Sequence, residues 1–186
     1  MDAAVGVPIL GTMTQDRPRT RSTTPRTPRT PRTIRRHRAR ELAMQVLFFW
    51  DTHGAADQQG AWRLVAQDAQ ADSIGKKAME IATAAWEDRL AADRWVERLA
   101  PQWPPRRQPG VDRNILRLAI WELTHLPTPH KVVIDEAIEL AKDYSTEQSA
   151  SFVNGVLDAV LKEHRAPVDP AALPDPSTIE PPPDQD

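Results

Sequence analysis

Apolar residues recur at intervals of three and four positions through most of residues 34–165. This spacing places side chains on one face of an α-helix, whereas half-buried strands alternate apolar and polar residues. No stretch of the sequence combines sustained alternation with enrichment in β-branched residues. The pattern therefore predicts an all-α fold of about six to seven helices.

The strongest helical pattern lies in residues 34–51. Its apolar stripe consists of Leu42, Ala43, Val46, Leu47 and Trp50. A turn is predicted to follow at His53-Gly54, and a short helix is predicted over residues 61–69. One face of the first helix should therefore pack in the core while its other face and its start stay accessible.

Between residues 72 and 100 the apolar positions predict one long helix. Asp72 or Ser73 is the expected N-cap, because both side chains accept hydrogen bonds from the free N–H groups of a first turn. The helix is expected to be interrupted near Asp88. Four prolines between residues 101 and 109 then predict a non-helical connection.

Three more helices are predicted after this connection. Asp112 is the expected N-cap of the first, which Pro127 and Pro129 bring to an end. The second occupies residues 131–144. Residues 145–148, with the sequence STEQ, have the spacing of a capping box and should start the last helix.

The two ends of the chain differ from the middle in composition. Residues 1–33 carry six arginines against two aspartates and end in TPRTPRTPRT, whereas residues 166–186 carry five acidic residues and neither lysine nor arginine. Their many prolines and few apolar residues predict disordered tails around one domain at 34–165. The basic tail adds non-specific attraction for phosphates, or is only a solubilising extension, or results from an upstream start codon with Met13 as the true start.

Composition excludes several classes of protein. The chain has no cysteine, which excludes disulfides, thiolate metal sites and a cysteine nucleophile and fits a reducing compartment. No apolar run approaches the roughly 20 residues that a membrane-spanning helix needs. A signal peptide is not recognisable either. We therefore expect a cytoplasmic protein without membrane contact.

A cationic cluster opens the first helix. It consists of Arg35, Arg36, His37, Arg38 and Arg40. Cations at a helix N-terminus oppose the macrodipole by about 0.3–1 kcal/mol each, so stability alone does not explain them. Guanidinium groups bind phosphates bidentately, and we interpret the cluster as a contact surface for RNA phosphates. The alternative is a solvated helix start with no ligand.

Two aromatic residues and an asparagine are further candidates for RNA contact. Phe48 lies off the apolar stripe and would stack on an unpaired base, unless it is buried against a second helix. Phe152 and Asn154 are expected at a helix start, where free N–H groups favour an anion. The alternatives are core packing for Phe152 and a cap or interhelical hydrogen bond for Asn154. Gly155 is expected to permit close approach of helices.

Catalytic and metal-binding patterns are not evident in the sequence. Asp135, Glu136 and Glu139 resemble an acid–base or metal group, but Lys142 follows three residues after Glu139, which favours a solvated ion-pair face. The five histidines match no paired-ligand spacing. A glycine-rich phosphate loop, a nucleophile elbow and a kinase signature are also absent. We therefore expect no enzyme activity, no cofactor and no metal.

Four ordered blocks resemble the NusB family of bacterial transcription antitermination and ribosomal RNA maturation factors. The blocks are RRHRARELAMQVLFFWD, DRNILRLAIWEL, KVVIDEAIELAKDYS and SFVNGVLDAVLKE, within residues 34–163. The resemblance implies two small helical bundles packed across each other. It implies binding of boxA-like nascent ribosomal RNA together with the ribosomal protein NusE, in a transcription elongation complex. The same fold precedes some ribosomal RNA methyltransferases, so an accessory domain of an RNA-modifying enzyme is the alternative, and a purely structural helical module is a third.

The resemblance also assigns roles to single residues. The family's basic helix start corresponds to the cationic cluster, with His37 in place of a frequent arginine, and Phe48 replaces a usual tyrosine. The family's Phe-Val-Asn-Gly motif stands at 152–155, preceded by Ala150 and Ser151, where charged or polar residues are common. The expected RNA-binding residues are Arg35, Arg36, His37, Arg38, Arg40, Phe48, Phe152 and Asn154. The expected docking face for the basic protein partner comprises Asp112, Glu122, Asp135 and Glu139. Some family members form homodimers through the RNA-facing helix, so a homodimer is possible here.

Overall fold

The computed structural model describes residues 30–66 and 71–164, and all regular secondary structure in this part of the chain is helical, without strands. It contains α1 (Pro31–His53), α2 (Gln58–Ala66), α3 (Ala71–Glu87), α4 (Arg89–Leu99), the 3₁₀ turn η1 (Pro105–Arg107), α5 (Gly110–His125), α6 (His130–Tyr144) and α7 (Glu147–His164). The predicted all-α class is confirmed.

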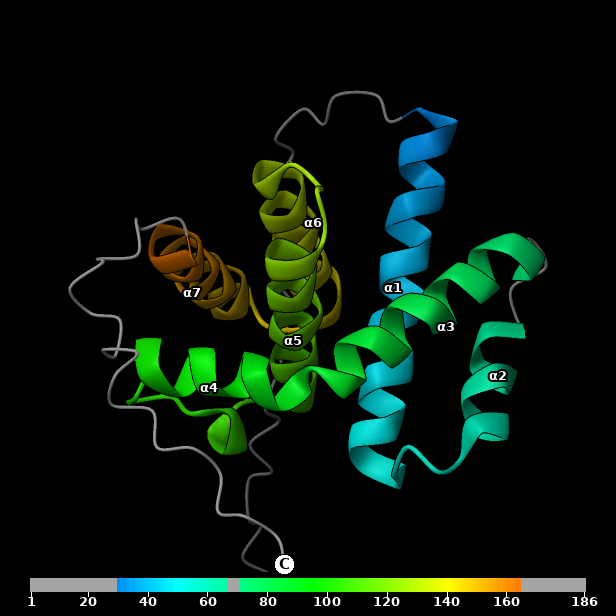
Figure 1. The fold of residues 1–186 in the computed structure, drawn as a ribbon, viewed down its shortest axis with the longest axis horizontal. Helices are drawn as coiled ribbons and strands as arrows, with labels where there is room; N and C mark the ends of the chain where they lie inside the picture. The colour runs from blue at the N-terminus through cyan, green and yellow to red at the C-terminus, as the bar shows by residue number, and fades with distance from the viewer. Residues whose placement is uncertain (1–29, 67–70, 165–186) are drawn as a thin grey trace, which may run out of the picture.

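The helices form two bundles that meet at α5. Helices α1, α2 and α3 pack against one another, while α4, α6 and α7 gather around α5. Figure 1 shows the first bundle on one side of the molecule and α4 and α7 on the other, with α5 and α6 between them. Because α5 also packs on α1 and α3, it joins the two bundles.

The predicted apolar stripe of α1 lies in the core. Its buried residues are Ala39, Leu42, Ala43, Met44, Val46, Leu47 and Trp50. They face α2, α3 and α5, and full burial of each large apolar side chain stabilises the fold by roughly 1.5–3 kcal/mol. The stripe therefore holds α1 firmly against both bundles.

Helix α1 begins three residues earlier than the sequence pattern indicated. Pro31 occupies the first turn, and the Oγ1 of the N-cap residue Thr30 accepts a hydrogen bond from the Thr33 backbone N–H at 3.3 Å. Proline is compatible with a first turn because the N–H that it lacks has no partner inside the helix. The last TPRT repeat therefore starts a helix. The other tail predictions concern residues 1–29 and 165–186 and lie outside the described residues.

The turn at Gly54 and the break at Asp88 are both confirmed. Gly54 has a positive φ of 91° and ends α1, and Asp88 separates α3 from α4. The short second helix spans 58–66 where 61–69 was expected; residues 67–70 lie outside the described part of the chain. Neither Asp72 nor Ser73 is an N-cap, since α3 already includes Ala71.

The cap predictions for α5 and α7 were wrong in detail. Pro109 precedes α5, and Asp112 lies in its first turn, where its Oδ2 accepts a hydrogen bond from the Ser149 hydroxyl at 2.7 Å. At α7, the Thr146 Oγ1 accepts from the Ser149 N–H at 3.2 Å, in place of the proposed box between Ser145 and Gln148. Ser149 therefore ties the start of α7 to the start of α5.

Close helix approach occurs at Gly110 and not at Gly155. A Cβ on Gly110 would lie 2.8 Å from the Phe48 ring, which connects the start of α5 to α1. Gly155 is exposed, and a Cβ there would meet no atom within 4 Å. The close-packing role predicted for Gly155 is therefore wrong. None of the described helices is long and apolar enough to cross a membrane.

Candidate nucleic-acid interface

The cationic cluster at the start of α1 is divided by the fold. Arg35 and Arg36 are exposed, and among the described residues neither guanidinium is paired with a carboxylate. Arg32, one turn earlier, is exposed as well. Arg35 and Arg36 are therefore the members of the cluster that are available to a phosphate, and Arg32 lies beside them.

Arg38 is half-buried and engaged within its own helix. Its Nη1 lies 2.6 Å from the Glu41 Oε1 one turn later. The Tyr144 hydroxyl, from the end of α6, donates a hydrogen bond to the same carboxylate. Burial and the negative charge of Glu41 raise the pKa of Tyr144 to about 12, so this hydroxyl stays protonated and holds Glu41 in place. An RNA phosphate would compete with Glu41 for Arg38.

Arg40 belongs to the core and not to the surface. Its Nε donates to the Glu122 Oε2 at 2.8 Å and its Nη2 donates to the Glu122 Oε1 at 2.5 Å. Arg40 is 8% exposed and Glu122 is 5% exposed. Burial alone would lower the pKa of Arg40, but the Glu122 carboxylate outweighs it and the pKa is raised. The structure therefore corrects two expectations, since the RNA-binding candidate Arg40 and the partner-docking candidate Glu122 neutralise each other between α1 and α5.

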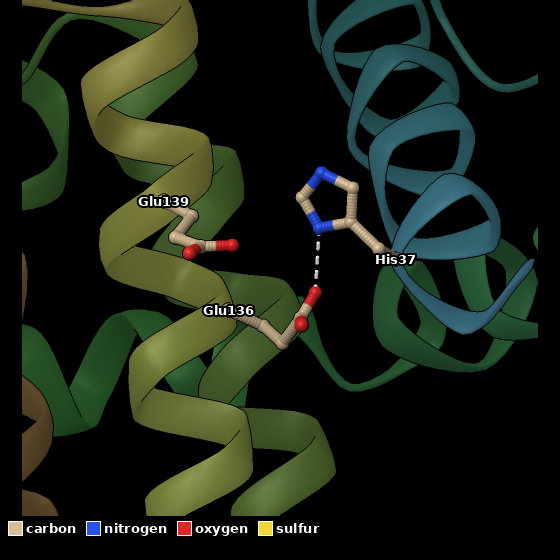
Figure 2. A group of neighbouring side chains, drawn as sticks. All are labelled: His37, Glu136 and Glu139. Atoms are coloured by element: carbon tan, nitrogen blue, oxygen red, sulfur yellow. Dashed lines mark hydrogen bonds and ion pairs between the residues drawn. The ribbon is translucent and has the colours of Figure 1, made fainter. Parts of the chain in front are cut away.

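His37 turns toward α6. Its Nδ1 lies 2.6 Å from the Glu136 Oε2, and both side chains are largely buried. Figure 2 shows His37 on α1 facing Glu136 and Glu139 on α6. The imidazole is therefore a contact between α1 of the first bundle and α6 of the second.

A groove of about 890 Å³ lies beside the exposed arginines. The start of α1, one side of α3 from Ser73 to Ala84, the end of α5 and the connection between α5 and α6 form its walls. Its lining includes the cations Arg32, Arg35, Arg36, Arg40 and Lys77, the carboxylates Glu80 and Glu122, and the apolar residues Ile74, Ile81, Trp121 and Leu126. Lys77 is paired with Glu80 at 2.9 Å. A cationic rim above an apolar and aromatic surface suits a single-stranded nucleic acid, whose phosphates and bases need those two kinds of contact.

Several lining residues were not identified from the sequence. Arg32 was assigned to the disordered tail, and Lys77 and Trp121 lie on other predicted helices. If Pro31 is accepted as a first-turn residue, the helix includes Arg32. Arg32 and Arg36 are four positions apart, so the sequence would then have placed them on the same helix face. Lys77 and Trp121 have no comparable sequence signal, because only the packing of α3 and α5 brings them to α1.

Phe48, Phe152 and Asn154 do not surround the exposed arginines. Phe48 is 39% exposed, but it lies 12 residues after Arg36, which is about 18 Å along a helix. Phe152 is half-buried against the core, as the alternative interpretation stated. Asn154 donates to the Asp158 Oδ2 at 3.4 Å. Because α7 begins at Glu147, Phe152 and Asn154 lie beyond the first turn, where free N–H groups would bind an anion.

The acidic docking face is smaller than expected. Asp112 is 3% exposed and bonded to Ser149, and Glu122 is occupied by Arg40, so neither presents a surface to a partner. Asp135 is exposed, with the Lys131 Nζ 3.9 Å from its Oδ2. Glu139 is half-buried. The docking hypothesis is therefore confined to the α6 surface that carries Asp135 and Glu139.

A second ion-pair network, which sequence reasoning missed, lies at the other end of α1. Asp51 accepts hydrogen bonds from Arg113 and Arg117, and Arg117 also binds Asp93 on α4 at 2.7 Å. Burial would raise the pKa of Asp51, but the hydrogen bonds and charges of the two arginines lower it. The network joins α1, α4 and α5, so these arginines hold the bundles together.

The fold and the arginine-bearing helix start define an all-helical, two-bundle protein with a basic groove, and comparisons with known proteins agree. Residues 37–162 match the model of the NusB family. The chain is 40% identical over 139 residues to the transcription antitermination protein NusB of Solibacter usitatus, covering 74% of this chain and 95% of the relative. It is 42% identical over 135 residues to NusB of Chloroflexus aggregans, covering 70% and 89%. The chain belongs to the NusB family.

Solved structures of the family have the same fold. NusB of T. maritima superposes with a TM-score of 0.60 at 35% identity, covering 74% of this chain and 94% of that one. A crystal structure described as the antitermination factors NusB and NusE in complex with dsRNA matches with a TM-score of 0.63 at 28% identity, covering 70% and 98%. In that complex a relative of this chain is bound to NusE and RNA.

Proposed function

We propose that this chain is an RNA-binding transcription antitermination factor without catalytic activity. It binds a boxA-like segment of nascent ribosomal RNA together with a NusE-type ribosomal protein, as part of a cytoplasmic transcription elongation complex, and thereby supports ribosome biogenesis. The observation that carries the proposal is the exposure of Arg35 and Arg36 at the rim of the groove. The relatives named as antitermination proteins, and the complex of one relative with NusE and RNA, support it.

In this proposal the exposed arginines supply affinity and the groove supplies the site for bases. Arg32, Arg35 and Arg36 contact the phosphate backbone, which releases counterions and makes binding salt-dependent. Unpaired bases lie in the groove, where Trp121 offers an aromatic surface. Arg38 contributes when a phosphate replaces Glu41 as its partner. Phe48, Phe152 and Asn154 remain predicted RNA contacts of a longer RNA that follows the molecule beyond the groove.

The test is RNA binding measured by fluorescence anisotropy over a salt series. A boxA-like RNA is titrated with the wild-type chain, with Arg35→Ala/Arg36→Ala and with a control, Arg63→Ala/Arg94→Ala, whose exposed arginines lie on α2 and α4. We expect the first variant to lose about 1.4 from the slope of log affinity against log salt, since each phosphate contact to single-stranded RNA contributes about 0.7. The control has the same net charge and should keep the wild-type slope. Equal slopes for all three proteins would contradict the assignment.

The protein partner is tested separately. We propose that the NusE-type protein docks on the exposed acidic side of α6, because such a ribosomal protein is basic and Asp135 is accessible there. Co-purification of the wild-type chain with the ribosomal protein, compared with Asp135→Lys, should show weaker association for the variant. Sedimentation of the chain without RNA would reveal a homodimer through α1, which would cover Arg35 and Arg36 and reduce RNA binding at high protein concentration.

A further inference from the structure

Three side chains that can bind a metal ion meet between α1 and α6. They are His37 from α1 and Glu136 and Glu139 from α6, and one potential ligand atom from each lies within 4.8 Å of the others. Figure 2 shows the three side chains directed into the same space between the helices. The two glutamates lie three positions apart, which places them on one face of α6. The cluster thus joins residues that are about 100 positions apart in the sequence.

The surroundings distinguish this cluster from an ordinary acidic surface. Glu136 is 6% exposed, and His37 and Glu139 are half-buried. Two carboxylates that share a partly buried space repel each other, and a cation between them removes this repulsion. Arg40 attracts Glu136 electrostatically and donates hydrogen bonds from its Nε and Nη2 to Glu122. A divalent cation placed between the three side chains would attract both carboxylates at once.

We propose that His37, Glu136 and Glu139 form a binding site for a divalent transition-metal ion, with Zn²⁺ as the best match. One imidazole nitrogen and two carboxylate oxygens are a donor set that zinc accepts, with water in the remaining position. The metal replaces the hydrogen bond between the His37 Nδ1 and the Glu136 Oε2, so that both atoms bind the ion. No electron transfer or bond cleavage is involved, and the site acts as a link between the two bundles.

The geometry requires only small side-chain movements. Ligand atoms at about 2.1 Å from a tetrahedral zinc lie roughly 3.4 Å apart. The His37 and Glu136 atoms, now 2.6 Å apart, would separate slightly, and the Glu139 carboxylate would approach them. Glutamate has rotatable bonds that allow this shift without moving the helix backbone. Binding would hold α1 against α6 at a point next to Arg36 and Arg38.

A substitution of His37 can separate metal binding from the contact with Glu136. Arginine at this position can donate a hydrogen bond to Glu136 but offers no lone pair to a metal. His37→Arg therefore removes metal binding while preserving the contact between the bundles. Glu139→Gln removes a second ligand with little change in shape. Matched controls are His125→Gln and Asp143→Asn, which change an exposed histidine of α5 and an exposed carboxylate of α6 outside the cluster.

The experiment uses the full chain freed of metal by a chelator and then dialysed. Zn²⁺ alone is titrated by calorimetry, Co²⁺ is used as a spectroscopic substitute, and thermal unfolding is followed with and without Zn²⁺. In the calorimetric titration we expect one Zn²⁺ ion per chain to bind in the step that His37→Arg removes. We expect Tm to rise by roughly 5–10 °C when free Zn²⁺ exceeds the dissociation constant about 100-fold. Both controls should behave as the wild type. His37→Arg and Glu139→Gln should each weaken binding at least about tenfold and lose the rise in Tm.

The opposite results would overturn the proposal. They are an absence of Zn²⁺ binding by the wild-type chain, or binding that His37→Arg and Glu139→Gln leave unchanged, as expected if the acidic residues after position 165 captured the ion. Circular dichroism of each variant before titration identifies a loss of fold, and either of the two cluster variants alone suffices for the comparison. The measurement contains no RNA and is therefore independent of the proposed function.

Discussion

The two ends of α1 use the same chemical groups for opposite purposes. At the beginning, Arg35 and Arg36 face solvent beside the groove. About 22 Å further along the helix, Asp51 gathers Arg113 and Arg117 into a network that joins three helices. The guanidinium group is identical in both places, so its role depends on whether a carboxylate of the same chain reaches it.

Arg40 marks the transition between these two regions. It lies only one turn after Arg36 in the same cationic cluster, yet Glu122 of α5 binds it with two hydrogen bonds. One helical turn therefore separates an arginine available to RNA from one that belongs to the core. In a run of basic residues, only the side chains that tertiary packing leaves exposed to solvent can bind a ligand.

The largest effect is expected for Arg40→Ala. The substitution leaves the Glu122 carboxylate buried without its cationic partner, which costs about 3–5 kcal/mol in the free energy of unfolding. Chemical unfolding followed by circular dichroism measures the loss. Arg36→Ala, one turn earlier, serves as the control and should change stability by less than about 0.5 kcal/mol. Similar values for both variants would contradict the division of the cluster.

A smaller loss is expected for Asp51→Asn at the other end of α1. Asparagine retains the shape but removes the charge that binds Arg113 and Arg117, and we expect a destabilisation of about 2 kcal/mol. The same unfolding experiment measures it at neutral pH. Asp143→Asn, which changes an exposed aspartate of α6, is the matched control and should remain close to the wild type. If Asp51→Asn left the free energy of unfolding unchanged, the network would not stabilise the junction between the bundles.

The stabilisation by Asp51 should also depend on pH. Its pKa is lower in the folded chain than in the unfolded chain, so its contribution is fully present above the unfolded value of about 3.9 and is lost as pH falls through the folded pKa. The difference in unfolding free energy between wild type and Asp51→Asn should therefore be constant from about pH 7 to pH 5 and shrink below about pH 4. Urea unfolding at stepwise pH measures this difference. A gap that widened toward low pH would have the wrong sign.

The smallest effect on stability belongs to the exposed arginines. Arg35→Ala/Arg36→Ala should change the unfolding free energy by less than about 0.5 kcal/mol, because surface substitutions without partners rarely do more. The same variant should lose RNA affinity, as described above. These two measurements together distinguish the two ends of α1, because substitutions at its start should weaken RNA binding without changing the free energy of unfolding. A large loss of stability in this variant would mean that these arginines have a structural role.

Much of the fold follows from local patterns in the sequence. Leu42, Val46 and Trp50 repeat at helical spacing, so their burial in α1 was predictable from periodicity. The end of α1 at Gly54 was predictable because glycine readily adopts a positive φ. The start of the helix was misplaced because the prolines of the TPRT repeat were interpreted as helix breakers, although proline at a first turn costs nothing.

The candidate site was predictable only in outline. The sequence by itself determined the helices, the apolar stripe and the presence of a basic segment at one helix start, because each depends on neighbours within a few positions. Tertiary structure alone decided which basic residues remain accessible, since Glu122 is 82 positions from Arg40 and Glu136 is 99 positions from His37. Coulomb attraction and hydrogen bonding act over a few ångströms of space, and only the packing of α5 and α6 on α1 brings these carboxylates within that range.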